Sequence, residues 1–518
     1  MAGIWADAFR RSEVARDADF FELGGDSLTG LVIVGEVEER FGCSIGLETF
    51  ATVRTPAALA RLISDERAGS RRRKPAVAAG DDSGDGSGEY PLSLAQEPIW
   101  KYCQTTEASG LYGKVLEYEV FGPVEVGVLR EALPRLVERN AGLRTVFAAG
   151  PLQRVLPSMD LPVSVVDAIG ARDADGVVTA VAREHANHEY DLERGPLAGL
   201  TVIRLGAERY YLVLYAHNLI CDRVSAQAIW RELCTEYDAL LSGEARPPAR
   251  RGASYGEFAA RQRRLGGAGV GELAEWRARL QGAPPRLELP FRRDTPDPTA
   301  TVADGTIERV LSPATSRRAD ALAASAGVTR YVLRLAAGAA QLMLDGDARD
   351  LVLGVYLPGR PHEHRATVGL FLHLGVVRLQ VDPQRAFGDW LPEVRSAVVA
   401  VAGSELPYEF VSSALAAEGS VSPEVTAIFD ARVASQEQVR LGGYRTVRGE
   451  ERRVAAMPWG FHLLADSPRA ALVLRAEFDA RIYEPTAVGA FIARLERLLA
   501  RACEHPDHSI AWLGGGGD

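Results

Sequence analysis

Polar side chains that could move protons follow a buried strand near the middle of the chain. Residues 210–216 form a continuous run of aromatic, β-branched and aliphatic residues, which is typical of a strand buried on both faces. His217, Asn218, Asp222 and Arg223 come directly after this run. A histidine near a carboxylate suits acid–base chemistry, but a lone histidine at a strand end is more often a structural, hydrogen-bonded residue.

The segment after these residues must position them. From Ser225 onward, Ala228, Ile229, Leu233 and Tyr237 recur at roughly helical spacing. The pattern predicts an amphipathic helix with Ser225 as its N-cap. The polar residues therefore lie in the turn between a buried strand and a helix.

A second reactive position lies near the N-terminus. Residues 1–66 contain three helical patterns, and the third begins with Thr55 as N-cap and Pro56 in the first helical position. Gly24 and Gly25 allow a tight turn just before Ser27, whose hydroxyl is expected at a helix N-terminus. An ordinary N-cap serine would give the same pattern.

The rest of the chain is longer and mixed in type. Residues 67–90 lose apolar periodicity and are rich in Gly, Ser, Asp and Arg, which predicts a flexible linker. Residues 91–518 alternate strand and helix patterns, which indicates the α/β class. We expect a buried helix over residues 328–343 and a closing helix around residues 491–499.

Composition excludes several functions and compartments. The net charge of −10 disfavours nucleic acid as a partner. We expect no membrane segment and no signal peptide, because neither pattern occurs in the chain. Five scattered cysteines without Cys-x-x-Cys spacing argue against a disulfide framework or a metal site and favour a reducing cytoplasm.

The central stretch resembles condensation domains of non-ribosomal peptide synthetases, whose motif is His-His-x-x-x-Asp-Gly. Counting back from Glu232 and Leu233, His217 takes the first His, Asn218 the second, Asp222 the Asp and Arg223 the Gly. Further motifs of that family are matched in order by residues 93–100, 139–147, 255–259, 358–372 and 405–409.

This resemblance implies a two-lobed chloramphenicol acetyltransferase-like fold around a tunnel. We expect the lobes to cover residues 91–275 and 276–518. It also implies that Asp222 has a structural part, paired with Arg360 or another basic residue, and that His373 replaces an asparagine usual in the family.

Residues 19–28 resemble the Leu-Gly-Gly-(His or Asp)-Ser motif of peptidyl carrier domains from the same synthetases. The resemblance implies a small four-helix bundle over residues 1–66, with 4′-phosphopantetheine attached to Ser27. It further implies a phosphopantetheinyl transferase that installs the group. Because no adenylation pattern is present, a separate adenylation domain would load the carrier.

The two altered motif positions leave three hypotheses open. X domains of glycopeptide synthetases also differ at these two positions; they do not condense but recruit cytochrome P450 oxygenases. The favoured hypothesis is therefore a non-condensing domain that recruits a trans-acting tailoring enzyme, such as a P450, or serves neighbouring modules. The second is an atypical condensation domain with Asn218 as positioner, since an amide side chain cannot accept a proton near neutral pH. The third, an epimerase, is suggested by Asp26 beside Ser27.

Overall fold

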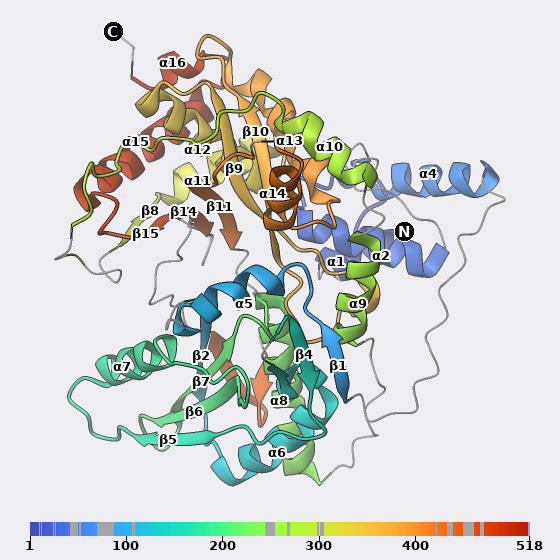
Figure 1. Ribbon diagram of the computed structural model, residues 1–518, viewed down its shortest axis with the longest axis vertical. Coiled ribbons are helices and arrows are strands. Elements are labelled where there is room, and N and C mark those ends of the chain that lie inside the picture. Colours follow the sequence, from blue (N-terminus) through green and yellow to red (C-terminus); the bar gives the residue numbers. More distant parts are fainter. Residues whose placement is uncertain are drawn as a thin grey trace.

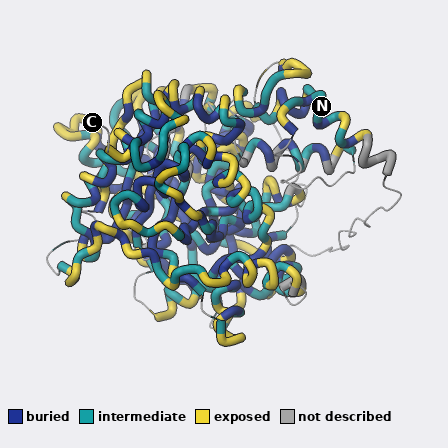
Figure 2. The backbone as a smooth tube through the Cα atoms, turned by 90° about the horizontal axis from the view of Figure 1, so that it is seen from above, coloured by how far each residue is buried: buried dark blue, intermediate teal, exposed yellow. Residues whose placement is uncertain are grey.

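The computed structural model has a small helical domain followed by two α/β lobes (Figure 1). Buried segments concentrate inside the lobes, and exposed segments lie at the periphery (Figure 2). The structure describes residues 1–518 except residues 10, 12, 24, 26, 42–49, 51–52, 70–86, 106–108, 149, 244–253, 267–269, 298–299, 301–304, 421, 433–438, 449–459, 467–470 and 516–518.

The N-terminal domain is helical, as predicted. Its described helices are α1 (Ala2–Phe9), α2 (Ser27–Phe41) and α4 (Pro56–Gly69). The expected start at Thr55 is confirmed, because the Thr55 hydroxyl accepts the Ala58 N–H at 3.2 Å. An aromatic core holds the helices together, with Phe20 packed edge-on against both Trp5 and Phe50.

Regular secondary structure extends into both ends of the predicted linker, residues 67–90. Helix α4 continues to Gly69, and strand β1 (Gly88–Pro91) pairs with β4 (Leu152–Val155) and through it with β3 (Thr145–Phe147). The basic and glycine-rich runs at residues 71–74 and 80–86 lie outside the described residues.

The first lobe is built on a six-stranded sheet in the order β12-β13-β2-β7-β6-β5. Its strands are β2 (Gly113–Phe121), β5 (Val163–Asp167), β6 (Ala198–Arg204) and β7 (Arg209–His217), with β12 (Arg440–Leu441) and β13 (Tyr444–Arg448) added from the second half of the chain. The helical segments of this lobe are α5 (Gln96–Thr105), η1 (Ser109–Tyr112), α6 (Val126–Arg139), η2 (Ala141–Arg144), α7 (Ala174–Ala186) and α8 (Arg223–Ser242).

Strand β7 lies inside this sheet, between β2 and β6. Its last six residues are all buried, which confirms the prediction of a strand covered on both faces. Antiparallel pairing sets His217 opposite Gly113, the first residue of β2. The end of β7 is thereby held at a defined place beside η1.

The second lobe has a sheet in the order β10-β9-β11-β14-β15-β8. Its strands are β8 (Thr306–Val310), β9 (Asp350–Leu357), β10 (His373–Gln380), β11 (Ala427–Arg432), β14 (Phe461–Asp466) and β15 (Val473–Phe478). Its helical segments are α10 (Val270–Leu280), α11 (Pro313–Ser325), α12 (Arg330–Gly346), η4 (His362–His364), α13 (Phe387–Ala402), α14 (Tyr408–Ala417), α15 (Pro485–Glu504) and α16 (Ile510–Leu513). Helix α9 (Tyr255–Gly266), which falls within the range expected for the first lobe, packs against β1.

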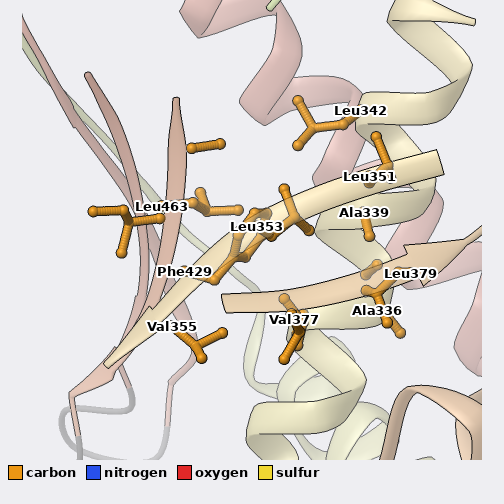
Figure 3. Packing of buried hydrophobic residues seen from close by; sticks show 14 of the residues in the cluster. Ala336, Ala339, Leu342, Leu351, Leu353, Val355, Val377, Leu379, Phe429 and Leu463 are labelled. Atoms are coloured by element: carbon orange, nitrogen blue, oxygen red, sulfur yellow. The ribbon is translucent and has the colours of Figure 1, made fainter. Parts of the chain in front are cut away.

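Helix α12 lies in the second lobe's core, where the sequence predicted a buried helix over residues 328–343. Ala336, Ala339 and Leu342 face the buried side chains of β9 and β10, and Phe429 and Leu463 extend this contact across the sheet (Figure 3). A Cβ at Gly338 would lie 2.0 Å from the Phe429 ring, so the helix approaches the sheet closely at that point. The predicted closing helix is α15, which is also buried along one face.

The two lobes exchange chain. Strand β13 pairs with β2, so residues from the second half of the sequence complete the first lobe's sheet. The sequence did not indicate this exchange. A second contact between the lobes is made by residues 368–371, which lie against the N-terminus of α8 in the first lobe. There the Asp222 N–H donates to the Gly369 carbonyl at 3.1 Å.

The helical N-terminal domain lies against the second lobe (Figure 1), and residues 21–25 of the carrier share a pocket with residues of α11 and α12. Arg54 Nη2 donates to the Ala324 carbonyl at 3.3 Å, and α2 lies beside η4. A pocket of about 250 Å³ lies at the junction, lined by Phe21, Glu22 and Gly25 on one side and by residues of α11 and α12 on the other. The loop before Ser27 thus faces the second lobe.

Candidate functional site

His217 ends strand β7 with its side chain fully buried. Its Nδ1 accepts the Leu219 N–H at 3.1 Å, so the proton is on Nε2, which donates to the Ser109 carbonyl at 3.1 Å. Burial lowers the pKa of His217 to about 4, although the bond to Ser109 acts in the opposite direction. A neutral imidazole with both nitrogens bonded to the backbone has no site left for a substrate proton.

Asn218 opens the turn after β7. Its N–H donates to the Tyr112 carbonyl at 2.9 Å, and its own carbonyl accepts the Cys221 N–H at 3.2 Å. The side chain is half-buried, and within the described part of the chain its Oδ1 has no hydrogen-bond partner. An amide held in this way can accept or donate a hydrogen bond to a ligand, but it cannot take up a proton near neutral pH.

Asp222 is the N-cap of α8, and its Oδ1 accepts the Ser225 N–H at 2.8 Å. The prediction of Ser225 as N-cap is therefore wrong; the carboxylate three residues earlier takes that place, which also suits the positive end of the helix dipole. Ser225 is buried, and its hydroxyl donates to the Gly369 carbonyl at 2.8 Å.

Arg360 pairs with Asp222 across the two lobes. Its Nη2 lies 2.8 Å from Asp222 Oδ1 and 2.7 Å from the Ser225 hydroxyl, while Nη1 donates to the carbonyls of His364 and Thr367. The guanidinium also lies over the Phe371 ring, 4.0 Å from its centroid. The pairing that the sequence hypothesis required is present, and it fastens the second lobe to the start of α8.

Arg223 is the first residue of α8 and is half-buried. Its backbone is helical, so the loss of the family's glycine imposes no left-handed strain at this turn. The side chain replaces a hydrogen with a long cation at the end of the turn that carries Asn218.

His373 begins β10 and is buried. Its Nδ1 lies 3.3 Å from the Phe371 carbonyl, and burial lowers its pKa. Gly359 packs against it with a φ of +50°, and a Cβ at that position would lie 2.5 Å from His373 Nδ1. This close contact explains the glycine in the turn that precedes Arg360.

The remaining matched motifs support the same turn from behind. Gln96 Nε2 donates to the Leu219 carbonyl at 2.8 Å, and the Tyr255 hydroxyl donates to Ser93 and contacts the Leu370 carbonyl. On the other side of α8, Arg139 pairs with the buried Glu236 at 2.8 Å. These contacts support residues 217–225 structurally and do not involve the side chain of Asn218.

Ser27 is the first residue of α2, directly after the loop that faces the second lobe. Asp19 holds that loop by accepting the Phe21 N–H at 2.9 Å and by pairing with Arg54 at 2.6 Å. A Cβ at Gly25 would lie 2.5 Å from the Phe20 ring, so the loop is packed too tightly for a side chain there. Backbone geometry thus suits a serine presented at a helix start, which is the position that a phosphopantetheine attachment site needs.

One residue beside Asn218 was not recognised from the sequence as functional. Tyr112 in η1 holds the Asn218 N–H through its carbonyl, and no motif marked it.

Residues 86–514 match the condensation domain family, and residues 1–63 match the phosphopantetheine attachment site family. The chain belongs to the condensation domain family. It joins this condensation domain to an N-terminal carrier domain, whose family carries 4′-phosphopantetheine on a serine. No helix within the described ranges has both the length and the apolarity of a membrane span.

Relatives of this condensation domain chain are peptide synthetases. Phosphinothricin tripeptide synthetase PhsB of Streptomyces viridochromogenes is 29% identical over 99% of the chain and 44% of its own length. Malpinin synthetase of Mortierella alpina is 29% identical over 80% of the chain and 5% of its length. The chain thus spans less than half of these relatives.

Solved structures establish the condensation fold. The chain is similar to the first condensation domain of the calcium-dependent antibiotic synthetase, with a TM-score of 0.69, 20% identity, and 82% and 98% of the two chains covered. It is also similar to the X-domain in a complex with OxyB from teicoplanin biosynthesis, with a TM-score of 0.70, 22% identity, and 86% and 99% covered. The predicted two-lobed fold is therefore confirmed.

Proposed function

We propose that this condensation domain does not form peptide bonds and instead recruits a trans-acting tailoring enzyme to the carrier that precedes it. One observation carries the proposal: the turn that holds the second histidine in condensing relatives carries Asn218, whose amide cannot shuttle protons. General-base help is worth about 10²–10⁴ in rate, so its loss removes much of the catalytic power.

The surroundings of Asn218 support this proposal. His217 is neutral, buried and fully bonded to the backbone, so it does not replace the missing base. The solved complex of an X-domain with OxyB provides a precedent for a similar fold that binds another protein. We propose a cytochrome P450 oxygenase as the recruited enzyme, with neighbouring synthetase modules as the other partners.

The carrier supplies the substrate in this proposal. We assign Ser27 as the attachment serine for 4′-phosphopantetheine, whose thiol carries the acyl or peptidyl group. A phosphopantetheinyl transferase would install the group, and an adenylation domain outside this chain would load it. We place the function in the cytoplasm, because the cysteines of the described residues form no disulfide bond, which suits a reducing compartment.

An atypical condensation domain is the second candidate. It is favoured by the intact frame around the turn, in which Asp222, Ser225 and Arg360 hold the two lobes together. In that case Asn218 would orient the attacking amine and the thioester. The free amine would be reactive enough to attack the thioester without a general base. An epimerase is not favoured, since it needs a base where Asn218 stands.

The deciding experiment loads the holo chain with an aminoacyl or peptidyl group on Ser27 and offers an aminoacyl acceptor on a second carrier. The recruitment proposal expects no amide product and a measurable affinity of the loaded chain for an oxygenase. Amide product that disappears in Asn218→Ala would overturn it and establish the second candidate. Ser27→Ala serves as the control that cannot be loaded.

A further inference from the structure

The contact between the carrier and the second lobe centres on Arg54, which precedes α4. Its Nη2 donates to the Ala324 carbonyl in the last turn of α11 at 3.3 Å, while its Nε pairs with Asp19 of the carrier at 2.6 Å. The guanidinium also lies 5.4 Å from the centroid of the Phe21 ring. Because the C-terminal end of a helix carries a partial negative charge, the end of α11 suits a cation. One side chain thus links the loop at residues 19–25 to the second lobe.

The turn after α11 allows this arginine to approach closely. Gly327 has a φ of +65°, and a Cβ at that position would lie 3.1 Å from Arg54 Nη1. The Gly327 carbonyl accepts a hydrogen bond from Arg395 of α13 at 2.9 Å, so the second lobe holds the turn from its own side. Glycine therefore serves both the left-handed backbone and the close approach of the carrier.

The loop before Ser27 is covered at this junction. Phe21, Glu22 and Gly25 form one wall of the pocket of about 250 Å³, and residues of α11 and α12 form the other. Gly25 is buried and Phe21 is half-buried. Because Gly25 is only two residues before Ser27, their Cα atoms are no more than about 7 Å apart. The second lobe therefore occupies space beside the residue that we assign as the attachment serine.

We propose that the end of α11 and the start of α12 form a docking surface for the chain's own carrier, and that docking shields Ser27 from the phosphopantetheinyl transferase. A specific protein interface covers about 800 Å² on each partner. A transferase that covers such an area around Ser27 would overlap with the second lobe, so the two partners exclude each other. This inference rests on the proposed function only in taking Ser27 as the attachment serine.

The rate of the transferase reaction reports this docking. Ser27 Oγ attacks the β-phosphorus of coenzyme A, which forms a phosphodiester, breaks the pyrophosphate bond and releases adenosine 3′,5′-bisphosphate and the hydroxyl proton. Only the undocked carrier reacts, so the rate at limiting transferase is proportional to the undocked fraction. A contact built on one arginine and a small pocket is reversible, so docking slows the reaction without stopping it.

The first test removes the arginine. Transfer from a fluorescent coenzyme A by a phosphopantetheinyl transferase is timed on the full-length apo chain. The loss of a charge-assisted hydrogen bond shifts an equilibrium by about tenfold, so Arg54→Ala should raise the initial rate by up to that factor. Arg61→Ala, which removes an exposed arginine elsewhere on the carrier, should leave the rate unchanged.

A pair of variants on the second lobe separates docking from the carrier's own fold. Ala321 is exposed on α11 and lines the pocket with Glu22, Asp320 and Arg330. Asp320 and Arg330 pair with each other at 2.8 Å. Ala321→Glu adds a carboxylate that repels Glu22, whereas Ala321→Gln has the same size without the charge. The glutamate variant should be labelled about twofold faster than the glutamine variant, and the difference should vanish at about 1 M salt.

Two results would overturn the inference. Equal rates in Arg54→Ala and the unmodified chain would show that the arginine does not hold the carrier. Equal rates in the two Ala321 variants would refute docking as the cause, even if Arg54→Ala is faster, because Arg54 would then act inside the carrier.

The assignment of Ser27 is tested separately. Ser27→Ala should not be labelled, and labelling that persists there would refute the attachment site and not the docking surface. Small-angle scattering tests the surface by itself, since Ala321→Glu should have a larger radius of gyration than Ala321→Gln. None of these measurements involves an oxygenase, so their outcome is independent of the recruitment experiment.

Discussion

Arg360 of the second lobe forms a buried ion pair with Asp222 at the start of α8 in the first lobe. Their side chains are 9% and 4% exposed, and Nη2 of the arginine lies 2.8 Å from Oδ1 of the aspartate. Asp222 Oδ2 also accepts the Phe371 N–H at 3.1 Å. The motif aspartate therefore caps a helix of one lobe and binds the backbone of the other at the same time.

Removing one partner of this pair should be costly. Arg360→Ala leaves the Asp222 carboxylate buried without its cation, and we expect a loss of about 3–5 kcal/mol in the free energy of unfolding. Urea denaturation measures it. The control is Arg277→Ala, which breaks an exposed pair with Glu418 and should cost no more than about 1 kcal/mol. Equal losses in the two variants would contradict the structural role of Arg360.

Restoring the family's histidine should restore chemistry. Because the backbone of residue 218 is fixed by Tyr112 and Cys221, Asn218→His places an imidazole at the position used by condensing relatives. We expect amide formation from the loaded carrier to rise by up to about 10²–10⁴ over the unmodified chain. Product is counted by mass spectrometry. A further gain with Arg223→Gly added would show that the arginine also obstructs the reaction.

The stability of the chain should depend on pH through His217. Its pKa is about 4 in the folded chain and near 6.5 when exposed, so the unfolded state binds more protons between these values. Stability is therefore full at neutral pH and is lost as the pH falls. Going from pH 7 to pH 5 should cost about 2 kcal/mol from this residue.

The variant His217→Gln isolates that contribution. His185 and His373 also have lowered pKa values because of burial, and they titrate in both proteins. The difference between the two proteins in the pH dependence of unfolding free energy thus reports His217. Identical dependence would mean that the imidazole is exposed to solvent.

The carrier should detach when Arg54 is removed. Arg54 joins Asp19 of the carrier to the Ala324 carbonyl of α11, and Arg54→Ala abolishes both contacts. We expect a larger radius of gyration in small-angle scattering with little change in the unfolding of the lobes. Arg61→Ala, an exposed arginine elsewhere on the carrier, is the matched control. Unchanged scattering in Arg54→Ala would show that other contacts hold the carrier.

The sequence predicted those elements that rest on local pattern. Helix α12, the closing helix α15 and the start of α4 at Thr55 and Pro56 follow from apolar spacing and capping chemistry, which act over a few residues. The motif order also predicted the two-lobed fold. The match of Asp222 to the family led to Arg360 as a partner, although the two are far apart in the chain.

Features that depend on long-range packing were missed. Ser225 has the residue type of an N-cap, but the local sequence does not show that its hydroxyl is buried and bonded to the Gly369 carbonyl. Asp222 is the N-cap instead, since its carboxylate accepts the Ser225 N–H. The short β13 has no strand signal strong enough to predict its pairing with β2.

The pairing of β13 with β2 limits how this protein can be divided or recombined. A hybrid that joins the first lobe of this chain to the second lobe of another synthetase would import two foreign strands, β12 and β13, at residues 440–448. The imported β13 would have to pair in register with residues 118–121 of β2. Otherwise the first lobe's sheet would keep an unpaired edge, which favours aggregation. Successful chimeras should therefore carry residues 440–448 along with the first lobe, as a second and separate graft.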